Sequence, residues 1–465
     1  SGEEAKAEAN RCIQCRCDAC IRHCGFLSYF EKFPKRIDEE VEVSITPVTL
    51  DGNGTVATRL ISTCNQCGLC KEVCPVDIDV GEYLRGSHRI MREKGAMPWA
   101  WHEFWLRDMA FSNGNRAALL LPSPGEKCDF LFFPGCQLGA SDPRYVLESY
   151  RALRKKDPGT ALLLGCCGAP AVWAGDNPLH EEVCGGIRRT WKELGSPPVI
   201  LACPSCLQMF GEFLPEIPTL FLSDHLLSRG VTPQPEEEEQ VVSVFDPCSA
   251  RYRPETQKNI RTLVEMASCR IEPLPYEGVQ AQCCSWGGQI SIANPPFADW
   301  LAKKRAGEGE YPYVTYCANC RDVFAETGKP VKHILDILFG LSGWNRRTPG
   351  ANERRRNRER LKEILSSEYL PGGHLSKEEP MEEEKRLTIP EEVRDRMDRD
   401  RLLEEDALAV IEECEATGVK VVDSTSGHIF GSGQVGQMTQ WVEYEAAPKG
   451  FVLHNTYSHR MKIEK

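Results

Sequence analysis

Short apolar runs bounded by turn residues dominate the middle of the chain. Residues 129–135 and 241–247 are two such runs, and each ends immediately before a cysteine. Apolar runs of about four to eight residues bounded by Gly or Pro are typical of buried strands. The pattern predicts strand, helix, strand, helix in residues 111–233 and the same order again in residues 234–345.

These two segments resemble copies of one another. Each contains a strand that ends at a cysteine, then an adjacent cysteine pair, then a second strand that leads into Cys-x-x-Cys. Equivalent cysteines are separated by 112, 117 and 114 residues, which indicates a duplication. Since α/β sheets build their sites where strands end, each copy should gather its cysteines at one edge of its sheet. The cysteines are Cys136, Cys166, Cys167, Cys203 and Cys206 in the first repeat, and Cys248, Cys283, Cys284, Cys317 and Cys320 in the second.

The pattern changes after residue 345. Residues 346–384 carry runs of basic and then acidic residues, which predict a solvated helix followed by a charged linker. Residues 385–465 are expected to form a small, separate α+β module that docks a partner. This module should contain a helix near residues 391–417 and β-structure that includes residues 441–444.

Two further cysteine arrays lie in residues 1–110. The more regular array spaces Cys64, Cys67, Cys70 and Cys74 as C-x2-C-x2-C-x3-C, with a proline following. In this spacing three thiolates surround one face of a cubane [4Fe-4S] cluster, and the fourth turns toward another cluster. A structural zinc site is the alternative, but such sites more often separate two C-x2-C pairs by a long loop.

The first array is irregular, with five cysteines between residues 12 and 24. Its start and its end match the same spacing with two extra residues inserted, which favours Cys12, Cys15, Cys20 and Cys24 as ligands. In the alternative assignment Cys17 joins Cys20 and Cys24, and Gln14 replaces the first ligand.

Composition decides between metal binding and disulfides for the 23 cysteines. Disulfide-dense chains are usually short and secreted, whereas this chain has 465 residues, tight Cys-x-x-Cys spacings and no apolar leader. No stretch approaches the roughly 20 apolar residues of a membrane span. The net charge of −12 argues against nucleic acid or an anionic membrane surface as the main partner. We therefore expect a cytoplasmic iron–sulfur protein.

The two N-terminal arrays together resemble a two-cluster bacterial-type ferredoxin. That resemblance implies two cubane [4Fe-4S] clusters that exchange ligands, so that Cys24 serves the second cluster and Cys74 the first. The duplicated segment resembles the cysteine-rich domain of the heterodisulfide reductase family, and the domain order over residues 10–345 matches its fused D subunit. In that family each repeat binds a non-cubane [4Fe-4S] cluster, at which a disulfide is split.

Three features depart from the family pattern. The 29-residue gap after the first cysteine of the first repeat is short, and residues 385–465 lie outside the pattern. In the second repeat Ser285 and Trp286 follow the cysteine pair, where the family has glycine. Because Trp286 would narrow the space above the second cluster, the resemblance favours the first repeat as the catalytic centre, with Cys136, Cys166, Cys167, Cys203 and Cys206 as its residues.

The resemblance also implies a function. No G-x-G-x-x-G motif opens a βαβ unit, so the chain should take single electrons from a partner, such as a flavoprotein or another redox subunit of a larger complex. It would then reduce a disulfide. The alternative is a non-catalytic conduit that links a dehydrogenase to quinone or to a membrane subunit. The expected fold is multidomain, α/β and α+β: a helical ferredoxin-like domain, a duplicated α/β domain and the C-terminal α+β module.

Other notable residues have plain structural explanations. Buried free cysteine is common, so the cysteines outside the arrays are expected to pack in the core. The aromatic group at residues 99–105 should join domains. The three C-terminal histidines lack i, i+4 spacing and are expected to be packing or surface residues. These residues are Cys128, Cys184, Cys269 and Cys414, then Trp99, Trp101, Phe104 and Trp105, and finally His428, His454 and His459.

Overall fold

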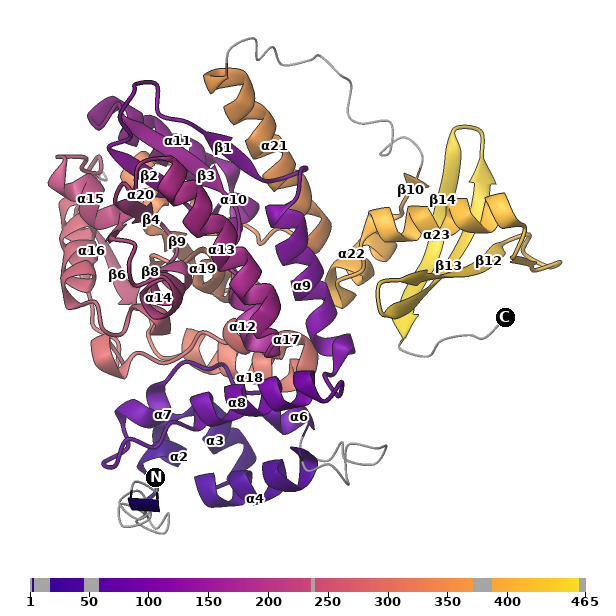
Figure 1. Cartoon of the computed structure of the whole chain (residues 1–465), viewed down its shortest axis with the longest axis horizontal. Helices are drawn as coiled ribbons and strands as arrows, with labels where there is room; N and C mark the ends of the chain where they lie inside the picture. The colour runs from indigo at the N-terminus through magenta and orange to yellow at the C-terminus, as the bar shows by residue number, and fades with distance from the viewer. Residues whose placement is uncertain (1, 4–16, 46–57, 236–238, 371–386, 460–465) are drawn as a thin grey trace.

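The computed structural model of the chain describes residues 2–3, 17–45, 58–235, 239–370 and 387–459. Figure 1 shows the N-terminal helices below the two repeats and the C-terminal module to one side. Within the described ranges, no helix combines the length and the apolar character that a membrane crossing requires.

The N-terminal domain consists of short helices that enclose its cysteines. Helix α8 begins at Val80 and is capped by Asp79, whose carboxylate accepts a hydrogen bond of 2.9 Å from the backbone N–H of Glu82. Leu27, Ile37 and Leu84 form the centre of its apolar core. The helices are α2 (Ala19–His23), α3 (Gly25–Phe30), α4 (Pro34–Ile45), α6 (Thr58–Ile61), α7 (Leu69–Glu72), α8 (Val80–Glu93) and the connecting α9 (Trp99–Asn113).

The first repeat is a five-stranded sheet in the order β1-β3-β2-β4-β5, with only β1 antiparallel to its neighbour. Its strands are β1 (Leu119–Leu121), β2 (Phe130–Phe133), β3 (Thr160–Leu164), β4 (Val199–Leu201) and β5 (Thr219–Phe221). Its helices are α10 (Cys136–Ser141), α11 (Pro143–Lys156), α12 (Ala169–Ala174), α13 (Asn177–Glu193), α14 (Pro204–Phe213) and α15 (Leu222–Ser228).

The second repeat is a four-stranded parallel sheet in the order β7-β6-β8-β9. Its strands are β6 (Gln240–Phe245), β7 (Cys269–Ile271), β8 (Tyr313–Thr315) and β9 (Val331–His333). Its helices are η1 (Cys248–Ala250), α16 (Pro254–Met266), η2 (Gly278–Gln280), η3 (Gly287–Gln289), α17 (Ile290–Ala293), α18 (Pro295–Ala306), α19 (Ala318–Glu326) and α20 (Ile334–Phe339).

The two sheets have the same topology once β1 is set aside, because β3-β2-β4-β5 corresponds to β7-β6-β8-β9 strand for strand. The apolar runs that the sequence identifies are β2, β4, β6 and β8. The structure adds β1, β3 and β5 to the first repeat and β7 and β9 to the second. The expected fold class, mixed α/β and α+β in several domains, is confirmed.

The charged segment after residue 345 differs from expectation. It does form a helix, α21 (Ala351–Tyr369), but this helix packs against α10 and α11 instead of lying in solvent. Arg354, Arg355 and Arg358 on it are buried. Arg358 donates two hydrogen bonds, of 2.7 and 2.8 Å, to the buried carboxylate of Asp108 on α9. The prediction of a solvated helix was wrong because the compensating carboxylates are distant in sequence.

The C-terminal module is a five-stranded sheet, β10-β14-β13-β12-β11, with helices on one face. In place of one helix over residues 391–417 there are two, because Arg401 takes a left-handed conformation (φ 56°) that ends the first. The elements are β10 (Leu387–Thr388), α22 (Glu391–Asp400), α23 (Glu404–Thr417), β11 (Val421–Val422), β12 (Ile429–Val435), β13 (Met438–Ala447) and β14 (Gly450–His459).

Polar contacts join this module to the rest of the chain. Arg107 on α9 donates to Asp406 at 2.8 Å, and Asn352 on α21 donates to the carbonyl of Leu402 at 3.0 Å. The guanidinium group of Arg401 lies over the ring of Trp105 at 4.8 Å. The aromatic residues of α9 therefore lie between domains, as the sequence suggests.

Removing residues 385–465 is expected to preserve the spectra of all the clusters, because the module has its own apolar core and contains none of the array cysteines. Association with a partner complex should weaken. The thermal midpoint of the remaining chain should fall, since Arg107 and Asn352 lose their partners. Visible circular dichroism and EPR of the anaerobic protein measure the first effect. A truncated chain that loses its clusters would show that the module is part of the core.

Candidate iron–sulfur sites

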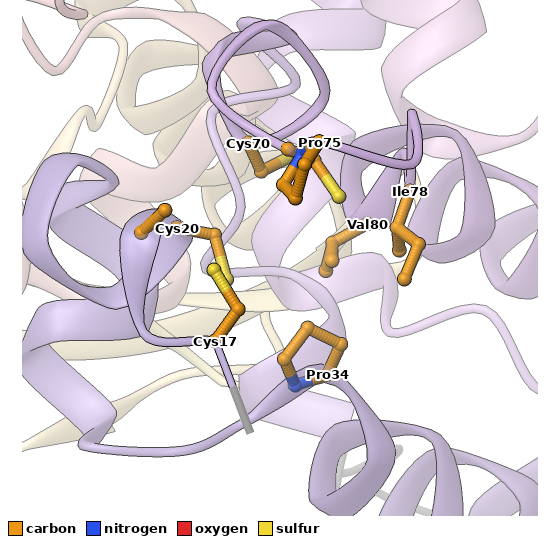
Figure 2. Close-up of a pocket in the computed structure, with 9 residues that line it drawn as sticks. Cys17, Cys20, Pro34, Cys70, Pro75, Ile78 and Val80 are labelled. Carbon is orange, nitrogen blue, oxygen red and sulfur yellow. The ribbon is translucent and has the colours of Figure 1, made fainter. Parts of the chain in front are cut away.

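A small apolar cavity marks the first N-terminal site. Cys17, Cys20 and Cys74 line it, together with Cys70 on its boundary with the second site. Figure 2 shows the sulfur atoms of Cys17 and Cys20 beside one another at this cavity. Cys12 and Cys15 lie outside the described residues. The sequence reasoning left Cys17 out of its preferred ligand set, although the spacing of Cys17, Cys20 and Cys24 could have pointed to it.

The second N-terminal site brings together Cys24, Cys64, Cys67 and Cys70, which share one cavity. Burial is the main cause that raises the pKa of each of these thiols, and repulsion between neighbouring thiolates raises it further. Four neighbouring thiols with little access to water match the donor set of a metal cluster. Cys24 lies with the thiols of the regular array, which is the exchanged arrangement that the ferredoxin resemblance implies.

The five cysteines of the first repeat converge from three loops at the ends of its strands. Cys136 follows β2, the pair Cys166 and Cys167 follows β3, and Cys203 and Cys206 begin α14. Hydrogen bonds from Cys166 and then Cys206 lower the pKa of Cys167 to about 6, so its sulfur lies at the centre of the group. Cys203 is the N-cap of α14, where the helix dipole favours a thiolate.

The second repeat reproduces this arrangement. Cys248 follows β6, Cys317 is the N-cap of α19, and Cys320 lies one turn into that helix. Hydrogen bonds from Cys283 and then Cys320 lower the pKa of Cys284 to about 6, as the equivalent contacts do for Cys167. The duplication that the sequence shows therefore extends to the contacts between thiols.

The four sites adjoin one another in a series, in which Cys70 borders both N-terminal sites. The thiol of Cys67, in the second N-terminal site, interacts with those of Cys248 and Cys283. Across the two repeats, Cys203 and Cys317 are in hydrogen-bond contact. The second repeat thus lies between the N-terminal domain and the first repeat.

An open cavity of about 260 Å³ meets the second repeat. All five of its array cysteines line the cavity, as does Cys67, whereas none of the first-repeat array cysteines does. The rest of the wall comes from all three neighbouring domains. It includes Trp173 and Glu212 from the first repeat, Arg85 from α8, and Arg251 and Trp286 from the second repeat.

Arg251 is the buried cation of this cavity. It is 2 % exposed, and its guanidinium group donates to the carbonyl oxygens of Cys67 at 3.3 Å and Ala281 at 2.7 Å. It interacts electrostatically with the thiols of Cys67 and Cys248. Its positive charge therefore lies where the second N-terminal site meets the second repeat.

Ser285 and Trp286, the two residues of the second repeat that depart from the family pattern, lie where this repeat meets the N-terminal domain. Ser285 has φ 95°, close to the φ 87° of its counterpart Gly168, so a residue with a side chain occupies a conformation that favours glycine. Its N–H lies 3.4 Å from the sulfur of Cys283. Trp286 packs edge-on against Trp105 at 5.1 Å and forms part of the cavity wall.

Three of the cysteines outside the arrays pack as expected. Cys184 and Cys269 are buried in the core of the first repeat and its neighbour, and Cys414 is buried in the core of the C-terminal module. Every described cysteine is a free thiol. The array thiols are soft donors in converging groups, a donor set that suits iron–sulfur clusters.

Comparison with known families agrees with this donor set. A model described as "4Fe-4S dicluster domain" matches residues 11–79, and one described as "Cysteine-rich domain" matches residues 130–211 and again 242–324. The chain contains a ferredoxin-type dicluster domain followed by two cysteine-rich domains, the domain order of a heterodisulfide-reductase-like iron–sulfur protein. The resemblance inferred from the sequence is confirmed, and the matches indicate iron–sulfur clusters as the cofactors of these domains.

Relatives in this family are distant. The B subunit of fumarate reductase (CoM/CoB) from Methanothermobacter marburgensis is 24% identical over 63% of this chain and 62% of its own length. An uncharacterized iron–sulfur protein of Methanococcus maripaludis is 22% identical over 70% of this chain and 72% of its own length. Among solved structures, a hypothetical protein from Helicobacter pylori has a TM-score of 0.41 at 12% identity, over 66% of this chain and 71% of that one. The chain thus spans less than two thirds of the fumarate reductase subunit.

Proposed function

We propose that this iron–sulfur electron-transfer subunit reduces a disulfide at the second repeat, using electrons that enter through the N-terminal domain. The observation that carries the proposal is that the cavity of about 260 Å³ bordered by all five array cysteines of that repeat continues beyond the thiols, which the cluster would occupy, to Trp173, Arg85 and Glu212. A reactive centre needs access for its substrate, and a pure relay does not. The sequence favours the first repeat as catalytic, and that stays a prediction which the variants in the Discussion test.

The proposal assigns four [4Fe-4S] clusters, two cubane and two non-cubane. When bound, these clusters supply the single electrons, while the protein holds them and excludes water from them. The first cubane would be held by Cys20, Cys74 and two of Cys12, Cys15 and Cys17, of which Cys17 lines the cavity. The second would be held by Cys24, Cys64, Cys67 and Cys70. Each set of five repeat cysteines would hold one non-cubane cluster.

The order of the sites supports a direction of transfer. Cys67 adjoins Cys248 and Cys283, so electrons that reach the second N-terminal site would pass directly into the second repeat. Arg251 at this boundary would stabilise added negative charge. The donor would be a flavoprotein or another redox subunit of a cytoplasmic complex, a role supported by the relative named as a subunit of fumarate reductase (CoM/CoB).

The reaction in the cavity would consume two electrons and two protons per disulfide and release two thiols. Trp173 and Trp286 offer apolar surface to the substrate. Arg85 forms an ion pair with Glu212 at 2.6 Å, so these two charges in the cavity wall neutralise one another. A wall of this kind suits an organic disulfide that carries both apolar and polar groups.

The test is turnover of the anaerobically purified full-length chain with reduced methyl viologen and a set of organic disulfides. Thiol release well above that from the dye alone supports the proposal. If thiol is not released, while the chain still passes electrons from a reduced flavoprotein to a quinone or a dye, the chain is a conduit.

Cofactor content gives an independent check. Four clusters of four irons imply about sixteen irons per chain and an equal amount of acid-labile sulfide. Iron and sulfide analysis with low-temperature EPR measures this. About eight irons, or zinc in stoichiometric amount at the cysteine arrays, would contradict the assignment of four clusters.

A further inference from the structure

The outer face of the C-terminal sheet brings together two histidines and a carboxylate that are separated in sequence. One ring nitrogen each of His428 and His454 and a carboxylate oxygen of Glu445 all lie within 4.8 Å of one another. The two imidazole rings are stacked, with centroids 4.1 Å apart and planes inclined by 8°. We propose that these three residues form a binding site for Zn²⁺.

Strand pairing and one irregularity create the cluster. Glu443 pairs with Asn455 and Tyr444 pairs with Leu453, so His454 is an extra residue in β14. A β-bulge of this kind re-aims a side chain locally. Tyr444 and Leu453 are fully buried beneath α23, whereas His454 is turned to the outer face, beside Glu445 and next to His428 at the start of β12.

The environment of each histidine suits a metal ligand. Glu443 accepts a hydrogen bond of 2.8 Å from Nδ1 of His428, which fixes the proton there and leaves a lone pair on Nε2. Carboxylates that orient ligating histidines in this way are a regular part of zinc sites. Nε2 of His454 is shielded from solvent and makes no hydrogen bond within the described part of the chain.

The distance between His454 and Glu445 also fits. Nε2 of His454 lies 3.5 Å from Oε1 of Glu445, which is long for a hydrogen bond. Two ligands bound to one tetrahedral Zn²⁺ at about 2.1 Å are separated by about 3.4 Å. Because the lone pair of an imidazole nitrogen lies in the plane of its ring, the stacked rings of His428 and His454 would rotate out of parallel to bind one ion between them.

The identity of the metal follows from the donors. Imidazole nitrogen favours zinc and other transition metals over Mg²⁺ or Ca²⁺, which prefer oxygen ligands. Two histidines with one glutamate form a known type of zinc ligand set, and three protein ligands leave a coordination position open to water. The site would be distinct from the cysteine arrays in both place and chemistry.

The experiment is a Zn²⁺ titration of the cluster-loaded full-length chain by calorimetry, followed by zinc X-ray absorption of the desalted complex. We expect one zinc per chain with a first shell of nitrogen and oxygen at about 2.0–2.1 Å and imidazole scattering. His428→Ala and His454→Ala should each abolish stoichiometric binding. Glu443→Gln should weaken binding by about 10- to 100-fold.

His459→Ala is the matched control, because His459 lies on the same sheet but accepts a hydrogen bond of 2.8 Å from Trp441. It should bind zinc as the wild type does. The proposal is overturned if the wild type does not bind zinc, if its first shell is sulfur at about 2.3 Å, or if the His428 and His454 variants retain the metal. The absorption spectrum of the wild type tests the proposal even if a variant misfolds.

Discussion

Cys284→Ser should lower dye-driven disulfide reduction by at least about 100-fold, since loss of even a supporting contact at a metal site costs about 10- to 100-fold. Cys284 lies at the centre of the thiol group that meets the open cavity, and a serine hydroxyl is a poor substitute for a thiolate ligand. The measurement is thiol release with reduced methyl viologen, paired with EPR to establish which cluster changes.

Matched variants separate the possible outcomes. Cys269→Ser removes a buried thiol from the same repeat outside the array and should leave turnover unchanged. Cys74→Ser should impair reduction by a protein donor but spare dye-driven turnover, because a small dye bypasses the N-terminal sites. If Cys167→Ser loses turnover while Cys284→Ser keeps it, the first repeat is the reactive centre. If both variants keep full turnover, the disulfide is not reduced at either repeat, and the assignment of the reactive centre to a repeat is overturned.

Arg358→Met is expected to lower the free energy of unfolding by about 3–5 kcal/mol, because it leaves the carboxylate of Asp108 buried beside fewer cations. Burial alone would raise the pKa of Asp108, but Arg358 and then Arg355 outweigh it and hold that pKa below its usual value. This contribution is therefore present at neutral pH and is lost as the pH falls through the depressed pKa. Thermal midpoints at one fixed scan rate, compared at neutral pH, measure the effect.

A second pair of variants identifies the cause. Arg356→Met, on the same helix, breaks a partly exposed pair with Glu404 and should cost no more than about 1 kcal/mol. Replacing both members, as Asp108→Leu with Arg358→Met, should recover much of the loss, because a buried pair exchanged for apolar groups is often neutral. If the single Arg358 variant is as stable as the wild type, the buried pair does not hold α21 in place.

The local parts of this fold follow from the sequence because their causes are local. An apolar run that ends at a cysteine specifies a buried strand with a thiol at its end, and this holds for β2, β4, β6 and β8. The similar distances between equivalent cysteines, 112, 117 and 114 residues, predict from the sequence alone that the two repeats form equivalent sheets. The regular array around Cys64, Cys67 and Cys70 is defined by spacing alone.

The rest depends on pairings between distant residues, which spacing does not encode. The sequence predicts that Arg358 is solvated, because its buried partner Asp108 is 250 positions away along the chain. The approach of Cys67 to Cys248 depends on how domains dock. His428 and His454 become neighbours only through strand pairing and a bulge. In each case the deciding partner lies on another element.

Gly287 and Gly288 allow the second repeat to approach the N-terminal domain closely at Cys64 and Asn65. A side-chain carbon on Gly287 would lie 2.7 Å from the carbonyl oxygen of Asn65, and one on Gly288, at φ 69°, would overlap the backbone at Cys64. Bare backbone therefore lies against bare backbone between the N-terminal domain and the second repeat. The rate of electron tunnelling falls steeply with distance. A methyl group added at Gly287 or Gly288 would therefore move the second repeat away from the N-terminal domain and slow the proposed electron transfer between them, without altering any cluster ligand.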